Sequence, residues 1–137
     1  MSLSRFLTFG IALFMSCTAE AACLLNDYSV RNEFEKSLAV VTGAVVGERV
    51  TPEHKGRYEG VTYTVKLQDP FRGRVSPTFE LFSENSSGRF PMIKGMECLL
   101  FIYDYGDVLA VDNCGNSGLL TERHKELHAV RDLARDK

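Results

Sequence analysis

The sequence predicts a mainly β domain, a small five-stranded barrel with one helix before it and one after it. Short runs rich in β-branched and aromatic residues are separated by turns that contain glycine or proline. Helical spacing of apolar residues is found in the segments before and after these runs. With 137 residues, of which 45% are hydrophobic, the chain has the length and composition of one soluble globular domain.

Residues 1–21 have the pattern of an export signal. An arginine gives a positive start, residues 6–15 are apolar, and Ala19-Glu20-Ala21 is a small-x-small cleavage pattern. The apolar stretch is too short for a membrane helix, which needs roughly 20 residues. We therefore expect cleavage after this pattern, one domain over residues 22–137, and a periplasmic or secreted location. A lipid anchor at Cys17 is the alternative.

Cleavage at this place removes Cys17 and leaves Cys23, Cys98 and Cys114. An oxidising compartment favours bridged cysteines, but three cannot all pair within one chain. A bridge from Cys23 to Cys114 and a cross-strand bridge from Cys98 to Cys114 are both open. The first is favoured because Cys98 lies within an apolar run, where a small buried side chain is the usual role.

The first helix is expected to begin after Asp27 or Ser29, since either residue can cap it. Val30, Phe34 and Leu38 recur every four residues, which places them on one helical face. We expect this face to pack against the core.

A strongly bent first strand is expected over residues 39–50. Gly43 and Gly47 lie within it at positions where a bent strand uses a bulge or a kink. A charged loop follows over residues 51–60. Residues 61–68 then alternate between apolar and polar side chains, which predicts a second strand with one buried face.

The rest of the chain is expected to contain a turn, a third strand, a hairpin of two mostly buried strands, and a closing helix. The turn is expected at residues 69–73 and the third strand at 78–82. The hairpin strands are expected at 99–103 and 108–111, with their turn at 104–107, and the closing helix at 119–137. Five short antiparallel strands with glycines at bends favour a closed OB-type barrel, because a flat sheet would leave its edges exposed.

Several short motifs occur in a recognisable order. They are an export signal, an early cysteine, a helix leading into Ala39–Val46, Tyr63-Thr64-Val65, Phe71-Arg72-Gly73, Gly95 before Leu99-Leu100-Phe101, and Asn113-Cys114-Gly115-Asn116-Ser117 before a last helix. Together they resemble the netrin-like domains, which include the tissue inhibitors of metalloproteases and similar bacterial proteins. The resemblance implies an OB-type barrel flanked by helices, with a disulfide between Cys23 and Cys114. It does not imply an enzyme.

The resemblance also raises metalloprotease inhibition as a function. In those inhibitors the mature chain begins with a cysteine that coordinates the zinc of the target, and a second bridge holds this terminus rigid. The present chain has a reduced cysteine set. Ser87 stands where the second bridge would need its mid-chain cysteine, and there is no Cys-x-Cys pair near Cys23. An untethered terminus loses affinity to ordering costs, so we expect no zinc-directed inhibition.

A basic face with aromatic side chains is the candidate binding surface. Its residues are Lys66, Arg72, Arg74 and Arg89 with Tyr63 and Phe71, and we assign Phe71, Arg72 and Arg74 as the candidate binding residues. The formal net charge of −2 argues against a nucleic-acid partner, because such binding needs a clustered excess of cations. We therefore expect a protein or polyanionic partner.

Catalytic and metal-binding patterns are weak. His124 and His128 have the i, i+4 spacing of a zinc helix, but Lys125 occupies the position of the metalloprotease glutamate. Ser117 lacks the spacing of a nucleophile elbow. We assign no catalytic residue, no metal ligand and no cofactor, and expect an exported non-catalytic binding module. A metalloprotease inhibitor and a small envelope hydrolase are the alternatives.

Overall fold

The computed structural model describes Cys23, residues 26–86 and residues 89–136. The expected export signal and Cys17 lie outside the described residues. The elements follow the order α1 (Val30–Lys36), β1 (Ala39–Thr51), β2 (Gly60–Arg72), β3 (Thr78–Glu84), β4 (Glu97–Asp104), β5 (Leu109–Val111), β6 (Gly118–Leu119) and α2 (His124–Arg135). The fold is mainly β, as predicted, with one helix before the strands and one after them.

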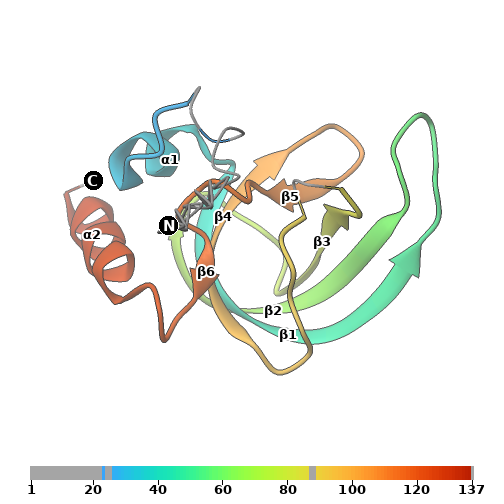
Figure 1. The fold of residues 1–137 in the computed structure, drawn as a ribbon. Coiled ribbons are helices and arrows are strands. Elements are labelled where there is room, and N and C mark those ends of the chain that lie inside the picture. The colour runs from blue at the N-terminus through green and yellow to red at the C-terminus, as the bar shows by residue number, and fades with distance from the viewer. Residues whose placement is uncertain (1–22, 24–25, 87–88, 137) are drawn as a thin grey trace, which may run out of the picture.

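The strands form one six-stranded antiparallel sheet with the order β3-β2-β1-β4-β5, while β6 pairs with β4 off this path. Figure 1 shows β1 and β2 as two long curved strands, and their curvature brings β3 close to β5. β3 and β5 approach each other but do not pair, so the sheet is not closed into a barrel. The closed OB-type barrel therefore stays a prediction.

The curvature of β1 coincides with irregularities in its pairing to β2. The register shifts between Val41 and Gly43 and again between Val45 and Gly47, as expected for bulges in a bent strand. A Cβ atom added at Gly43 would lie 2.6 Å from Cγ1 of Val65 on the neighbouring strand. Glycine at position 43 thus permits the close approach of β1 to β2. The register shifts next to Gly43 and Gly47 confirm the bulges predicted at both positions.

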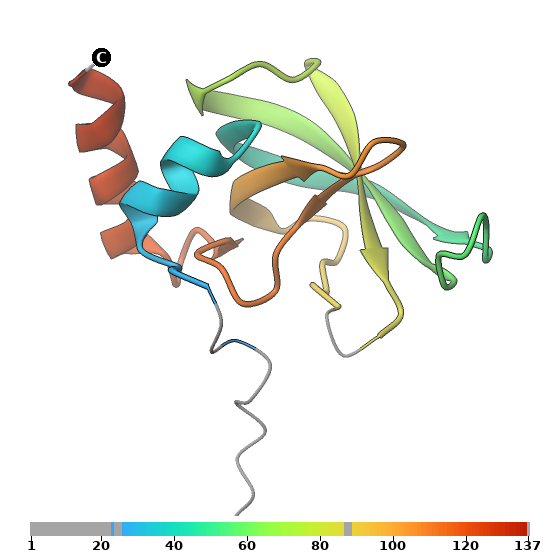
Figure 2. The same cartoon turned by 90° about the horizontal axis from the view of Figure 1, so that it is seen from above.

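β4 is buried on both faces, which explains its unbroken apolar run. Cys98, Leu100 and Ile102 belong to a core formed among the strands, whereas Leu99 and Phe101 belong to a second core shared with the helices. α1 and α2 lie together on one side of the sheet, away from the loop between β1 and β2 (Figure 2). The helices therefore cover one end of the molecule and leave the other end to the loops.

Some sequence expectations are wrong at the ends of elements. Ser29 caps α1, but the helix ends at Lys36, and Leu38 lies outside it with 43% of its surface exposed. β2 continues through the expected turn at residues 69–73 as far as Arg72. The closing helix begins only at His124, because residues 118–119 instead form β6 against β4.

Candidate functional site

A cleft of about 750 Å³ lies at the end of the sheet opposite the helices. Its walls come from the β1–β2 hairpin, from β3, and from the turn between β4 and β5. The lining residues are Arg49, Thr51, Pro52, Glu53, His54, Arg57, Tyr58, Thr62, Ser76, Thr78, Phe79, Glu80, Phe82, Asp107, Val108 and Leu109. This volume is in the range of small-ligand pockets, which makes the cleft the leading candidate site.

One wall carries a row of hydrogen-bonded polar side chains drawn from three strands. Nη2 of Arg49 donates to Oε2 of Glu80 at 2.9 Å, and Nη1 of Arg49 donates to the hydroxyl of Thr51 at 3.1 Å. The hydroxyls of Thr51 and Thr62 lie 2.5 Å apart. The row therefore presents donors and acceptors side by side along β1, β2 and β3.

An ion pair between Arg57 and Asp107 also lines the cleft. Nη1 and Nη2 of Arg57 donate to the two carboxylate oxygens of Asp107 at 2.8 Å and 2.7 Å. The guanidinium carbon also lies 5.6 Å from the centre of the Phe82 ring, within cation–π range. The hydrogen bond from Arg57 lowers the pKa of Asp107 to about 2. This pair connects the β1–β2 loop to the β4–β5 turn.

Two exposed tyrosines stand on the segments that this ion pair connects. Tyr58 lines the cleft and is 66% exposed. Tyr105 lies in the β4–β5 turn, is 56% exposed, and lines a smaller adjoining cavity that shares Arg57 and Phe82 with the cleft. Large exposed aromatic side chains are enriched at protein interfaces.

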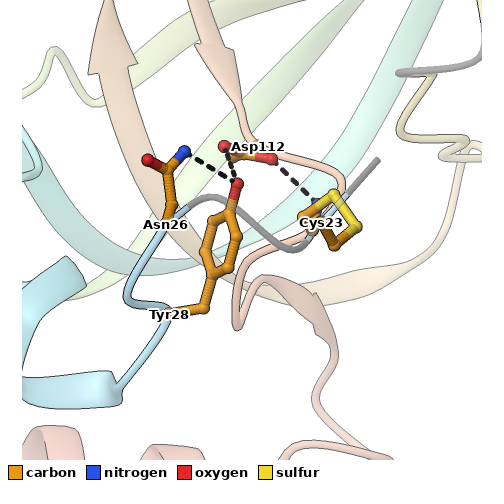
Figure 3. The surroundings of a disulfide bond; sticks show 5 residues. Cys23, Asn26, Tyr28 and Asp112 are labelled. Atoms are coloured by element: carbon orange, nitrogen blue, oxygen red, sulfur yellow. Dashed lines mark hydrogen bonds between the residues drawn. A yellow bond between two sulfur atoms is a disulfide. The ribbon is translucent and has the colours of Figure 1, made fainter. Parts of the chain in front are cut away.

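The predicted disulfide lies at the other end of the molecule. Cys23 and Cys114 are bonded, with their Cα atoms 5.5 Å apart, and the alternative bridge between Cys98 and Cys114 is excluded by this pairing. Figure 3 shows Asp112 between Tyr28 and the disulfide. One carboxylate oxygen of Asp112 accepts from the Tyr28 hydroxyl and the other from the backbone N–H of Cys114, both at 2.9 Å. The segment before α1 is thus fixed to the loop after β5.

A buried carboxylate strengthens this connection. Glu33 of α1 is only 2% exposed, and its Oε2 accepts from the backbone N–H and the side-chain amide of Asn116 at 2.6 Å and 2.7 Å. Its Oε1 accepts from the Tyr103 hydroxyl at 3.0 Å. Burial, followed by the charge of Glu33, raises the pKa of Tyr103. All these contacts satisfy the carboxylate, so we assign Glu33 a structural role.

The residues of the predicted basic face do not share one environment. Phe71 packs beside the core that the helices cover, and a guanidinium nitrogen of Arg72 donates to the backbone carbonyl of Ser37. Tyr63 is 1% exposed and belongs to the core among the strands, so it offers no surface ring. Arg74 is exposed at a separate small cavity beside Leu38.

The remaining candidates from the sequence are two histidines, a serine and a free cysteine. His124 and His128 are exposed on α2, where Nδ1 of His128 lies 3.1 Å from a carboxylate oxygen of Asp132. Ser117 is buried, with 3% of its surface exposed, and its hydroxyl accepts from the backbone N–H of Phe101 at 2.8 Å. Cys98 is a buried free thiol, as predicted, and burial raises its pKa to about 11.

Within the described residues, no cluster of three or more His, Cys, Asp or Glu side chains is arranged to hold a metal ion. Neither helix of the described part has the length and apolar content that a membrane span requires.

A scan against protein-family models finds no matching family, and a search of curated proteins finds no significant relative.

The cleft was not predicted from the sequence. Arg57 and Asp107 lie in different loops, and no local motif links them. The sequence did contain one indirect sign, which is the presence of tyrosines in two expected loops, at positions 58 and 105.

Proposed function

We propose that the chain is an exported, non-catalytic binding module of the netrin-like, OB-type class, and that it contacts a partner protein at the end of the sheet that carries the cleft. The disulfide between Cys23 and Cys114 supports export, since such bonds persist in oxidising compartments. The curved sheet with its flanking helices supports the proposed class. Processing after Ala21 belongs to the same proposal.

One observation carries the choice of surface. The exposed tyrosines Tyr58 and Tyr105 stand on two segments that the ion pair between Arg57 and Asp107 holds together. Tyrosine offers a large contact area at a low cost in conformational entropy. Joining the two segments that carry the rings before binding reduces the ordering cost of association. The paired loops are therefore a preorganised contact surface.

Site-specific photo-crosslinking tests this proposal. A photoreactive phenylalanine analogue is placed at Tyr58, at Tyr105 or at Lys125 of the full chain, and the chain is produced in a host that exports it. We expect one discrete protein adduct from the first two positions and none from Lys125 on α2. Adducts that form equally at all three positions, or at none, contradict the proposed surface.

The non-catalytic part of the proposal has its own test. The purified full chain is screened against ester, amide, glycoside and phosphoester substrates. Turnover that copurifies with the protein and disappears on substitution of a cleft residue would restore the small hydrolase. Mass analysis of the same preparation identifies the mature terminus, and a lipid-modified mass beginning at Cys17 would replace processing after Ala21.

A further inference from the structure

We infer that the interior of the cleft binds an uncharged oligosaccharide, a ligand class that goes beyond the protein contact proposed for the two tyrosines. The inference concerns the cavity wall formed by Arg49, Thr51, Thr62 and Glu80, together with the ring of Tyr58 at its edge.

The first step is the charge balance of the cleft. The charged side chains of the cleft and its edge are Arg49, Arg57, Lys55, Glu53, Glu80, Glu84 and Asp107. Carboxylates slightly outnumber cations, and each of the two arginines is already paired with a carboxylate. A polyanion that binds here would lie next to the carboxylates that already pair with both arginines. The cleft therefore favours an uncharged ligand over a polyanion.

The second step is the hydrogen-bonding capacity that the pairs retain. A guanidinium group has five N–H donors and a carboxylate can accept several hydrogen bonds. The contacts between Arg49 and Glu80 use only part of this capacity, and both side chains are more than half exposed. A sugar hydroxyl donates and accepts at once, so it matches a wall where donors and acceptors lie side by side.

The third step is the aromatic edge of the cleft. A sugar ring has apolar C–H faces as well as hydroxyls, and an aromatic ring with a polar tip suits such a mixed surface. Tyr58 is 66% exposed and lines the same cavity as the polar row. The cavity volume of about 750 Å³ accommodates a short oligosaccharide. The cleft thus combines a stacking surface, a polar wall and near-neutral charge.

NMR titration of the ¹⁵N-labelled full chain tests the inference. The probes are cellotetraose, maltotetraose and chitotetraose, with a heparin tetrasaccharide and a blocked Gly-Ser peptide as competing classes. We expect saturable shifts of cleft amides with at least one uncharged oligosaccharide. Glu80→Gln should weaken this binding about tenfold, because a neutral amide replaces a charged hydrogen-bond acceptor. Glu35→Gln on α1 is the matched control and should leave binding unchanged.

The outcomes separate this inference from the proposed protein contact. No saturable cleft shift with any uncharged probe at millimolar concentration overturns the oligosaccharide. Cleft shifts with heparin or with the peptide alone also overturn it. In both cases crosslinking from Tyr105 still decides the protein contact independently. Equal binding by Glu80→Gln and the original chain would show that the polar wall does not bind the sugar.

Discussion

Arg57 donates to both carboxylate oxygens of Asp107, although 50 positions separate the two residues in the chain. The pair connects the β1–β2 loop to the β4–β5 turn and so fixes one side of the cleft. Because both partners are partly exposed, the pair's role is to position two loops and not to stabilise the whole fold.

The connection between the loops should depend on pH. Asp107 has a folded pKa of about 2, below its ordinary value of 3.8, so the contribution of the pair is complete above pH 3.8 and is lost as the pH falls towards 2. We expect the carboxyl resonance of Asp107 to titrate in this range, together with loosening of the loop around Arg57. Asp107→Asn should give the loosened loop at neutral pH.

Asp136→Asn, at the end of α2, is the control for this experiment and should leave the loop unchanged. An ordinary titration of Asp107 near pH 3.8 would contradict the pairing.

Removal of the disulfide should destabilise the domain strongly. Cys23 and Cys114 are 91 positions apart. On the chain-entropy model, closing a loop of this length stabilises the fold by roughly 4 to 5 kcal/mol, which is an upper figure. Urea unfolding of Cys23→Ser with Cys114→Ser should therefore show a much lower midpoint than the original chain. An unchanged midpoint would mean that the bridge does not constrain the unfolded state.

Cys98 should be unreactive in the folded protein. The thiol is buried and its pKa is raised to about 11, so little thiolate forms at neutral pH. In a chain that begins at Ala22, and so lacks Cys17, we expect no modification by a thiol reagent in buffer and one modified cysteine after unfolding without reductant. Rapid labelling of the native chain would place Cys98 at the surface.

Loss of the Glu33 carboxylate should separate α1 from the loop after β5. Glu33→Ala leaves both donors of Asn116 without this acceptor, at a cost of about 1–3 kcal/mol. Glu33→Gln should cost less, because an amide oxygen still accepts from Asn116 while the Tyr103 hydroxyl reorients. The exposed Glu35→Ala on the same helix should be nearly neutral. Equal unfolding midpoints for Glu33→Ala and Glu35→Ala would be inconsistent with the buried network.

The core assignment predicts a similar contrast between β4 and α2. Leu100 is fully buried, so Leu100→Ala should cost roughly 2 to 5 kcal/mol through lost burial and the cavity left behind. Lys125→Ala, at an exposed position, should be nearly neutral. Chemical denaturation of both variants measures the difference. Comparable midpoints would show that the strand register is wrong.

The strands were largely predictable because their hydrophobic patterns are local. The pairing of β4 with β5, the bulged β1 and the pairing of Cys23 with Cys114 agree with the sequence-based predictions, but β5 is half-buried and not mostly buried as expected. The apolar run around Cys98 predicted a buried strand, and both faces of β4 are indeed covered. The hydrophobic patterns do not depend on contacts between distant segments. The pairing of Cys23 with Cys114 was favoured for another reason, since Cys98 lies within the apolar run.

The errors arise where tertiary contacts override local preference. Pro70 and Gly73 indicated a turn, but β3 pairs with β2 only up to Lys66, so Pro70 lies where one edge of β2 is free and proline is tolerated. Thr62 belongs to the polar side of the alternating segment 61–68, yet it is 6% exposed and its hydroxyl lies 2.5 Å from that of Thr51 on β1. Neither the free edge of β2 at Pro70 nor the contact between Thr51 and Thr62 can be recognised in the sequence.

The cleft could not be predicted for a related reason. Its wall joins side chains from three strands, and its ion pair joins two loops. The expected binding residues Phe71, Arg72 and Arg74 are neighbours in sequence, but they lie in different surroundings and none of them lines this cleft.

The disulfide also determines how the chain would carry mechanical load. A force applied between the two termini passes from Cys23 directly to Cys114 and then through residues 115–137, bypassing β1 to β5. Of the described elements, β6 and α2 lie on this path, and residues 115–137 span about 80 Å at most when fully extended. The part of the sheet that holds the cleft is therefore shielded from tension, and reduction of one bond is enough to expose it.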